Sequence, residues 1–217
     1  RFNADFEAAR IEELAADMLG GRLKGILGFD LTGDKKFRGS VAITGMELSD
    51  LAKIRPLTAE KRILATGKVS GNIDIMGGFE PELIFDATSN LQVEGLTVSY
   101  GESSSPKFSK SSVNARISYD GKVTRFESLG IETPASTVSA SGDLVDGRLS
   151  LSLDLKSSDL SEFGGYVNGA GVVKGRVAGP LSGPAVEGTL TLSNLYWGKY
   201  QADTLSGHIG FKEMVLT

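Results

Sequence analysis

Four leucines occupy every second position of the segment Leu149-Ser150-Leu151-Ser152-Leu153-Asp154-Leu155-Lys156. The residues between them are all polar. Successive side chains of a β-strand point to opposite faces of a sheet, so this spacing places the leucines on one face and the polar residues on the other. The segment therefore predicts a strand with one apolar face and one face in contact with water.

Weaker versions of the same alternation occur at residues 23–31, 41–43, 69–75, 113–119, 138–140 and 190–192. The chain also has 28 glycines and only 6 prolines. This composition is typical of many short strands joined by tight turns rather than of long helices. We therefore expect a mostly β fold.

One segment near the start, residues 5–19, has a different spacing. Its apolar residues recur at helical intervals, and Gly20-Gly21 supplies a stop signal; they are Phe6, Ala9, Ile11, Leu14, Ala15, Met18 and Leu19. We expect an amphipathic helix within residues 1–21. The exposed side of this helix is acidic rather than rich in Lys and Arg, which favours packing against the sheet, at one end of its apolar face, over lying on a membrane.

The two halves of the remaining chain resemble each other. Ser49-Asp50-Leu51 recurs as Ser158-Asp159-Leu160, and Gly67-Lys68-Val69-Ser70-Gly71 recurs as Gly175-Arg176-Val177-Ala178-Gly179. The serine-rich stretch of residues 101–112 has no apolar period and lies between them, which predicts a loop. We expect a first β-repeat unit at residues 22–100 and a second at 113–217, stacked into an elongated shape.

Composition and motifs argue against several classes of site. The net charge of −4 is too balanced to attract nucleic acid. The single histidine, His208, and the absence of cysteine leave no zinc site and no catalytic triad. Asp50 and Asp159 each follow a serine where a turn or short helix begins, which favours capping over acid–base catalysis. We expect no enzyme activity, no metal and no cofactor.

The glycine-rich stretches 164–165 and 169–175 superficially resemble phosphate-binding loops, but no GK[ST] triplet follows them. We expect these glycines to lie in turns between strands or at close backbone contacts. No apolar run is long enough to span a bilayer, and the chain begins without a signal peptide or an initiator methionine. We expect a fragment of a longer protein whose anchor lies elsewhere.

Two stretches resemble the AsmA-like and TamB-like envelope proteins. The first runs from Leu19-Gly20-Gly21 through Gly39-Ser40-Val41-Ala42-Ile43 to Leu48-Ser49-Asp50-Leu51, and the second from Gly175-Arg176-Val177-Ala178-Gly179-Pro180 through Gly188-Thr189-Leu190. The resemblance implies an elongated, strongly curved antiparallel sheet, shaped like a taco, in the periplasm of a Gram-negative bacterium. It also implies a bridge between the inner and outer membranes, with membrane-protein partners bound through parts outside this chain.

The function expected on this basis is the shielding of phospholipid acyl chains by an apolar groove. The candidate lining residues are Leu149, Leu151, Leu153, Leu155, Val41, Ile43, Val69, Ile73, Ile75, Val113, Ile117, Leu190 and Leu192. Period two alone fits equally well the inside face of a closed sandwich. A β-rich scaffold in outer-membrane protein assembly or secretion, pairing with partner strands by β-augmentation, remains the alternative function. An extracellular solenoid adhesin or a polysaccharide-active enzyme would need a short regular repeat or paired acids, and neither is apparent.

Overall fold

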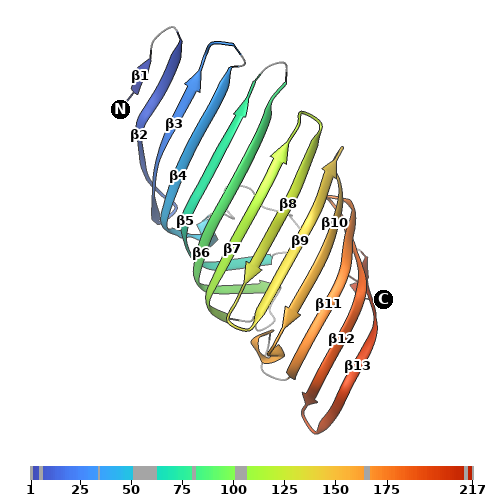
Figure 1. Ribbon diagram of the computed structural model, residues 1–217. Helices are drawn as coiled ribbons and strands as arrows, with labels where there is room; N and C mark the ends of the chain where they lie inside the picture. Colours follow the sequence, from blue (N-terminus) through green and yellow to red (C-terminus); the bar gives the residue numbers. More distant parts are fainter. Residues whose placement is uncertain are drawn as a thin grey trace.

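The computed structural model forms one antiparallel sheet in which every strand pairs with the next strand in the chain, from β1 to β14 (Figure 1). It describes residues 2–4, 7–33, 35–50, 63–79, 82–100, 107–163, 167–212 and 215–216. The sheet does not close on itself. The mostly β, antiparallel fold expected from the sequence is confirmed.

The first seven strands are β1 (Phe2–Ala4), β2 (Ala8–Met18), β3 (Gly21–Asp30), β4 (Lys36–Glu47), β5 (Ile63–Gly78), β6 (Ile84–Tyr100) and β7 (Lys107–Tyr119). The others are β8 (Val123–Glu132), β9 (Ser136–Val145), β10 (Arg148–Ser157), β11 (Val167–Pro180), β12 (Ala185–Trp197), β13 (Tyr200–Lys212) and β14 (Val215–Leu216). A short 3-10 helix, η1 (Leu160–Phe163), lies between β10 and β11.

Tight turns explain why consecutive strands pair. Leu19 and Gly20, between β2 and β3, have φ angles of 52° and 71°, and Asp146 and Gly147, between β9 and β10, have 48° and 73°. Two successive positive φ angles are the geometry of the two-residue type I′ turn, whose twist matches that of an antiparallel hairpin. Each such turn returns the chain directly beside the strand it has just left.

The prediction of an N-terminal helix is wrong, because residues 8–18 form strand β2 and pair with β3. A register shift between Ile11 and Leu14 marks a β-bulge. Ile11 lies opposite Leu27, and Leu14 lies opposite Gly25, so both fall on the same face of the sheet although they are three residues apart. The bulge therefore produces the spacing that imitates a helix.

The predicted loop at residues 101–112 is too long. Residues 107–112 belong to β7, while residues 101–106 lie outside the described part of the chain. β6 and β7 pair from Phe85 opposite Tyr119 to Thr97 opposite Lys107. The sheet therefore continues across the expected boundary between the two halves.

The sheet forms a single layer in the described part of the chain. Its accessible surface is 14375 Å², whereas a compact protein of 22.9 kDa would expose roughly 9,600 Å². The only buried apolar side chains among the described residues are Met46, Val69, Val93 and Phe108. A closed sandwich would bury many more, so the leucine-rich strand β10 does not have a second sheet packed over it here.

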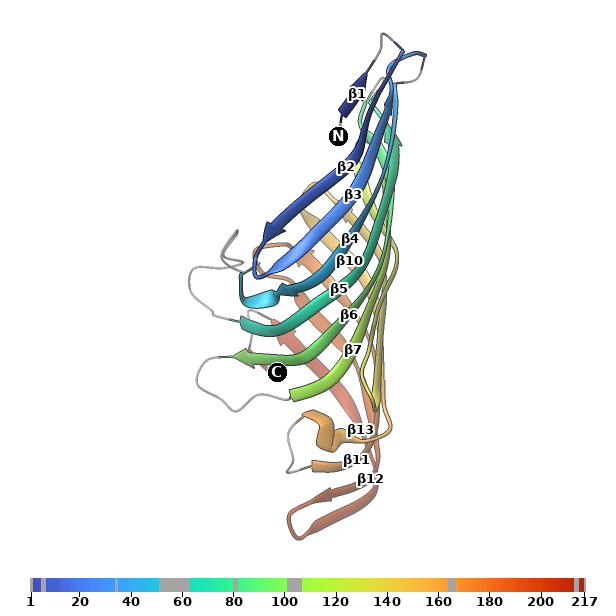
Figure 2. The same cartoon turned by 90° about the vertical axis from the view of Figure 1, so that its left-hand side faces the viewer.

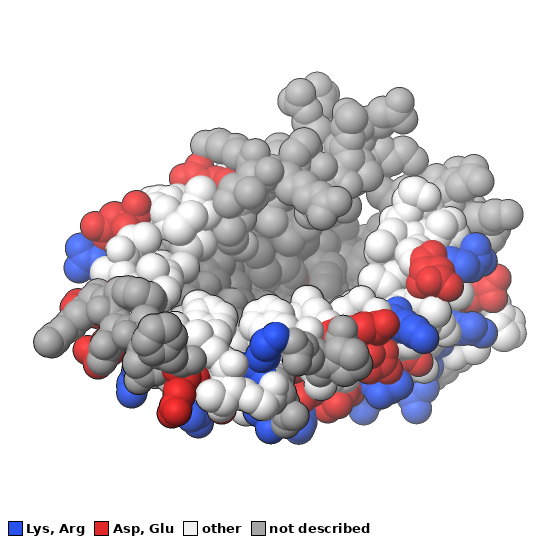
Figure 3. Space-filling view, turned by 90° about the horizontal axis from the view of Figure 1, so that it is seen from above, with Lys and Arg blue, Asp and Glu red and all other residues white. Residues whose placement is uncertain are grey.

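The strands bend along their length in Figure 2, and η1 lies on the side toward which they bend. Figure 3 shows the molecule from above with a hollow on one side. In that view most charged side chains lie along the outer side of the curve, and the described residues that face the hollow are mostly uncharged.

Candidate functional site

All thirteen residues predicted to line a groove lie on one face of the sheet. Residues directly opposite each other in paired strands share a face, as do alternate residues of one strand. Val41 lies opposite Ile73, and Ile75 is linked through Ala87 to Ile117. Leu155 is linked through Val173 to Leu190. We call this surface the apolar face.

The apolar face is continuous from β3 to β13. One row that crosses it contains no charged residue; its members, each opposite the next, are Leu27, Gly39, Ile75, Ala87, Ile117, Phe126, Gly142, Leu151, Val177, Val186 and Phe211. The neighbouring row is also uncharged and contains Gly25, Val41, Ile73, Ser89, Ala115, Leu129, Ala140, Leu153, Gly175, Gly188 and Ile209.

Large side chains on this face lie over glycines of the adjacent strand. A Cβ atom added to Gly39 would lie 2.9 Å from Leu27 Cδ1, and one added to Gly77 would lie 2.7 Å from Phe37 Cζ. These glycines let the apolar side chains of one strand lean across the next. This role of Gly39 and Gly77 was not predicted from the sequence, although glycines opposite leucines and phenylalanines carry the signal.

The apolar face is the concave side of the bend. Helix η1 lies on that side in Figure 2, and a Cβ atom at Gly171 would lie 3.2 Å from Leu160 Cδ2 of η1. Gly171 belongs to the apolar face because it lies opposite Leu192. Phe163 of η1 also meets Phe108 of β7 edge-to-face, with ring centroids 6.1 Å apart. The helix therefore covers a small part of the apolar face at one rim.

An aromatic cluster lies at the opposite rim, near the turns that follow β3 and β5. The Phe37 and Phe79 ring centroids are 4.8 Å apart, and Phe29 lies 6.4 Å from Phe79. Phe85 and Tyr119 follow along the same row at 5.6 Å. Phe79 is 48% exposed, so this end of the apolar face is open to solvent. The cluster could not be predicted from the sequence, because its residues become neighbours only through strand pairing.

The other face carries the charged residues. Arg116 Nε lies 2.8 Å from Glu127 Oε2, and Arg125 Nε lies 3.4 Å from Asp143 Oδ1. His208 lies opposite Thr189 on this face and is exposed, as predicted. This distribution keeps the ionised groups of the strands in water, where they cost least, and leaves the two central rows of the apolar face without charge.

The turn residues explain the aspartates that might otherwise suggest catalysis. Asp159 Oδ1 accepts a hydrogen bond from the Ser161 backbone N–H at 2.9 Å, and bonds from Ser161 lower the pKa of Asp159 below its usual value. The predicted capping role of Asp159 is confirmed. Asp50 lies in a short helical stretch, residues 48–50, and its capping role stays a prediction.

A second carboxylate, Glu162 of η1, ties this helix to the neighbouring turn. Its Oε2 accepts hydrogen bonds from Ser136 Oγ at 2.6 Å and from Thr133 Oγ1 at 2.7 Å, and its Oε1 accepts one from the Ala135 N–H at 3.2 Å. Ser136 and Ser157 are buried and bond to each other at 3.0 Å. These contacts stabilise the rim rather than forming a reactive site.

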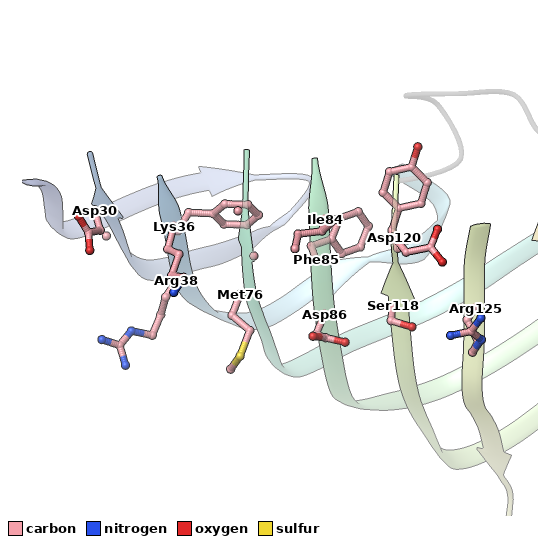
Figure 4. A pocket seen from close by; sticks show the side chains of 15 residues that line it. Asp30, Lys36, Arg38, Met76, Ile84, Phe85, Asp86, Ser118, Asp120 and Arg125 are labelled. Atoms are coloured by element: carbon pink, nitrogen blue, oxygen red, sulfur yellow. The ribbon is translucent and has the colours of Figure 1, made fainter. Parts of the chain in front are cut away.

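A depression of about 850 Å³ lies at the aromatic rim, and Figure 4 shows the side chains that line it. Phe85 belongs to the apolar face, whereas Met76 and Asp86 lie opposite each other on the charged face. Side chains from both faces of the single layer border this space at the ends of the strands. It is therefore an open depression at the rim of the sheet, not an enclosed cleft. Two of its carboxylates, Asp30 and Asp120, accept hydrogen bonds from Thr32 and from Lys122 and Val123, as turn residues do.

The glycines compared with phosphate-binding loops have a structural role. The expected turn position is wrong for Gly171 and Gly175, which lie inside β11, but the other expected role, a close backbone contact, is confirmed at Gly175. A side chain at Gly175 would collide with the carbonyl oxygen of Glu187 in β12. Gly164 and Gly165 lie outside the described residues.

Neither a metal cluster nor a membrane-spanning helix is present in the part of the chain that the structure describes. No protein-family model, curated protein or solved structure matches the chain. The candidate site is therefore defined by its own geometry, an uncharged apolar face on one side of an open sheet.

Proposed function

We propose that the apolar face shields lipid acyl chains from water, as the AsmA-like and TamB-like resemblance implies. The observation that carries the proposal is the continuous row of uncharged residues from β3 to β13, which is not covered by a second sheet in the described part of the chain. Monomeric soluble proteins rarely leave a long apolar surface without a partner. An acyl chain is a partner of matching chemistry.

Dimensions and energetics support this choice of ligand. Strands in a sheet lie about 4.8 Å apart, so the ten steps from β3 to β13 extend over roughly 48 Å. The hydrocarbon core of a bilayer is only about 30 Å thick and holds two opposed chains, so a whole acyl chain fits along the face. Exposing such a chain to water costs ~0.8 kcal/mol per CH₂, and the apolar face would remove much of that cost.

The absence of charge on the two central rows fits transport better than storage. A cationic site for a phosphate head group would hold the lipid at one position, whereas a uniform apolar surface lets it move. In this proposal the protein is a segment of a longer periplasmic protein that carries phospholipid between the inner and outer membranes. It has no enzymatic role, and its membrane-protein partners bind elsewhere.

The test uses the adjacent residues Leu153 and Ser152, which lie on opposite faces. A photo-crosslinking residue at Leu153 or Leu151 is expected to capture phospholipid in cells, and the same residue at Ser152 is not. Leu153→Asp is expected to block transport by placing a charge in the apolar path. Ser152→Asp introduces the same charge on the charged face and is the matched control. Equal crosslinking at 152 and 153, or none at either, would overturn the proposal.

The open sheet also keeps the scaffold function available. A sheet that does not close has two edge strands, here β1 and β14, and edge strands can pair with a strand of another protein. Purification separates the two functions, because a scaffold would carry no lipid on the apolar face. Mass spectrometry of the purified chain would show phospholipid in the first case and none in the second.

A further inference from the structure

The turn between β12 and β13 presents an unusual group of exposed aromatic residues. Trp197 is 61% exposed, Tyr200 65% and Tyr196 47%. Trp197 lies opposite Tyr200 as the last pair of the hairpin, and the turn consists of Gly198, with a φ of 59°, and Lys199. Figure 1 shows this turn at the lower end of the sheet, and in Figure 2 the hairpin bends toward the concave side. We call residues 196–200 the aromatic tip.

The aromatic side chains of the tip gain little burial within the hairpin. The Trp197 and Tyr200 ring centroids are 6.4 Å apart, and Lys199 Nζ lies 5.6 Å from the Tyr200 ring. Both rings remain mostly in water, so this pairing buries little of their surface. The two turn positions are occupied by Gly198 and Lys199, so the turn geometry itself does not call for aromatic residues beside it. The aromatic residues therefore indicate contact with something outside the hairpin.

The charge of the tip narrows the choice of partner. Between Gly188 and Ala202 the only charged residue is Lys199. The five residues of the tip therefore carry a formal charge of +1, although Asp203 follows three residues after Tyr200 and the chain as a whole has a net charge of −4. Trp and Tyr favour the boundary between water and hydrocarbon, because their rings are apolar and their N–H and O–H groups remain hydrated. Lysine beside them suits anionic head groups.

The size of the tip also favours a membrane over a protein. Three aromatic side chains with roughly half of their surface exposed present about 300 Å². A stable protein–protein contact buries about 800 Å² on each partner. Shallow insertion into a head-group layer needs no such area, because lipids rearrange around the inserted side chains.

We propose that the aromatic tip contacts a lipid bilayer, with Trp197, Tyr200 and Tyr196 at the head-group boundary and Lys199 beside the phosphates of anionic lipids. This contact does not depend on the apolar face. It would hold one rim of the sheet against a membrane surface.

Trp197 is the only tryptophan of the chain, so its fluorescence reports on the tip alone. The full chain is mixed with vesicles of phosphatidylcholine containing about one-third phosphatidylglycerol. The emission is expected to shift to shorter wavelength and to be quenched by brominated lipids. Association is expected to fall severalfold in pure phosphatidylcholine or in 0.5 M salt, because charges attract less strongly when screened. An unchanged emission in anionic vesicles would overturn the proposal.

Variants assign the effect to the tip. Lys199→Glu and Tyr200→Ser are expected to weaken vesicle association severalfold without changing the circular dichroism spectrum. Leu181→Ser, in another exposed turn, is the control and is expected to bind as the unchanged chain does. Leu153→Asp is also expected to bind vesicles normally, which separates this contact from acyl-chain shielding. Normal vesicle association of Lys199→Glu together with Tyr200→Ser would refute the inference.

Discussion

Replacing Glu162 with alanine should loosen the rim at which η1 lies on the sheet. The substitution removes the acceptor of three hydrogen bonds, from Ser136 Oγ, Thr133 Oγ1 and the Ala135 N–H. It also releases the segment that holds Leu160 against Gly171 and Phe163 against Phe108. The protein is expected to lose stability, most strongly around residues 133–136 and 158–163.

The size of the stability loss depends on which hydrogen bonds the Ser136 and Thr133 hydroxyls still make once the Glu162 carboxylate is removed. A hydrogen bond to a charged group contributes about 1.5–3 kcal/mol, so three independent bonds would contribute far more than one substitution usually costs. The hydroxyls keep other contacts, because Ser136 Oγ still bonds to Ser157 Oγ and Thr133 Oγ1 still bonds to the Ser136 carbonyl oxygen. We therefore expect a loss of about 2–3 kcal/mol.

Urea unfolding measures the effect. With a slope of roughly 2–3 kcal/mol per molar urea, Glu162→Ala should lower the midpoint by about 1 M. Glu127→Ala is the matched control, because its ion pair with Arg116 is short but exposed; exposed pairs contribute less than ~1 kcal/mol. Hydrogen exchange should also show faster exchange at the Ala135 amide in Glu162→Ala only. Equal losses in the two variants would refute the assignment of Glu162 as the anchor of η1.

Two further substitutions test other parts of the sheet. Gly142 has a φ of 145°, and a Cβ atom there would collide with the Ser150 carbonyl oxygen, so Gly142→Ala should lower the free energy of unfolding by at least ~2 kcal/mol, measured by thermal unfolding. Gly207→Ala is the control and should change stability little, because no atom lies within 4 Å of the added Cβ. Equal losses in the two variants would contradict this packing. Hydrogen bonds from the backbone N–H groups of Val123 and Lys122 lower the pKa of Asp120 below its ordinary 3.8. The ionised Asp120 should therefore stabilise the β7–β8 turn above pH 3.8, and this stabilisation should be lost as the pH falls through the lowered pKa. An NMR titration of the Asp120 carboxyl with a midpoint at or above 3.8 would exclude these bonds.

The alternation of apolar and polar residues was sufficient to predict the β class and the shared face of the thirteen candidate residues. It failed where a bulge changes the period. Ile11 and Leu14, like Phe126 and Leu129, are three residues apart and yet lie on one face, because one extra residue is inserted between them. A three-residue spacing between apolar residues is typical of a helix, so a helix was predicted for residues 5–19, where the structure has strand β2 at residues 8–18.

The aromatic rim and the glycines of the apolar face could not be predicted from local pattern. Phe37 and Gly77 are forty positions apart and become neighbours only through the register of β4 with β5. That register is fixed by the turns and bulges along each strand, and a single sequence does not specify them. The residues of η1 were predicted to begin with a capped turn, but the three-donor site for Glu162 depends on β8 and β9.

The pairing of large side chains with glycines has a consequence for how the apolar face would hold a ligand. Leu27 leans over Gly39, and Phe37 leans over Gly77, so leucine and phenylalanine side chains fill the spaces that a flat sheet would leave between them. The resulting surface is apolar, and no charged side chain interrupts it in the two central rows. An acyl chain on such a surface would bury the same apolar area at successive positions as it moves across the strands, from β3 toward β13. Small energy differences between neighbouring positions allow sliding, and larger ones would trap the ligand. Replacing Gly39 with valine would displace Leu27 and create a ridge across this path. We expect the variant to bind lipid but to transfer it more slowly between vesicles. Unchanged transfer would show that an even surface along this row is not required.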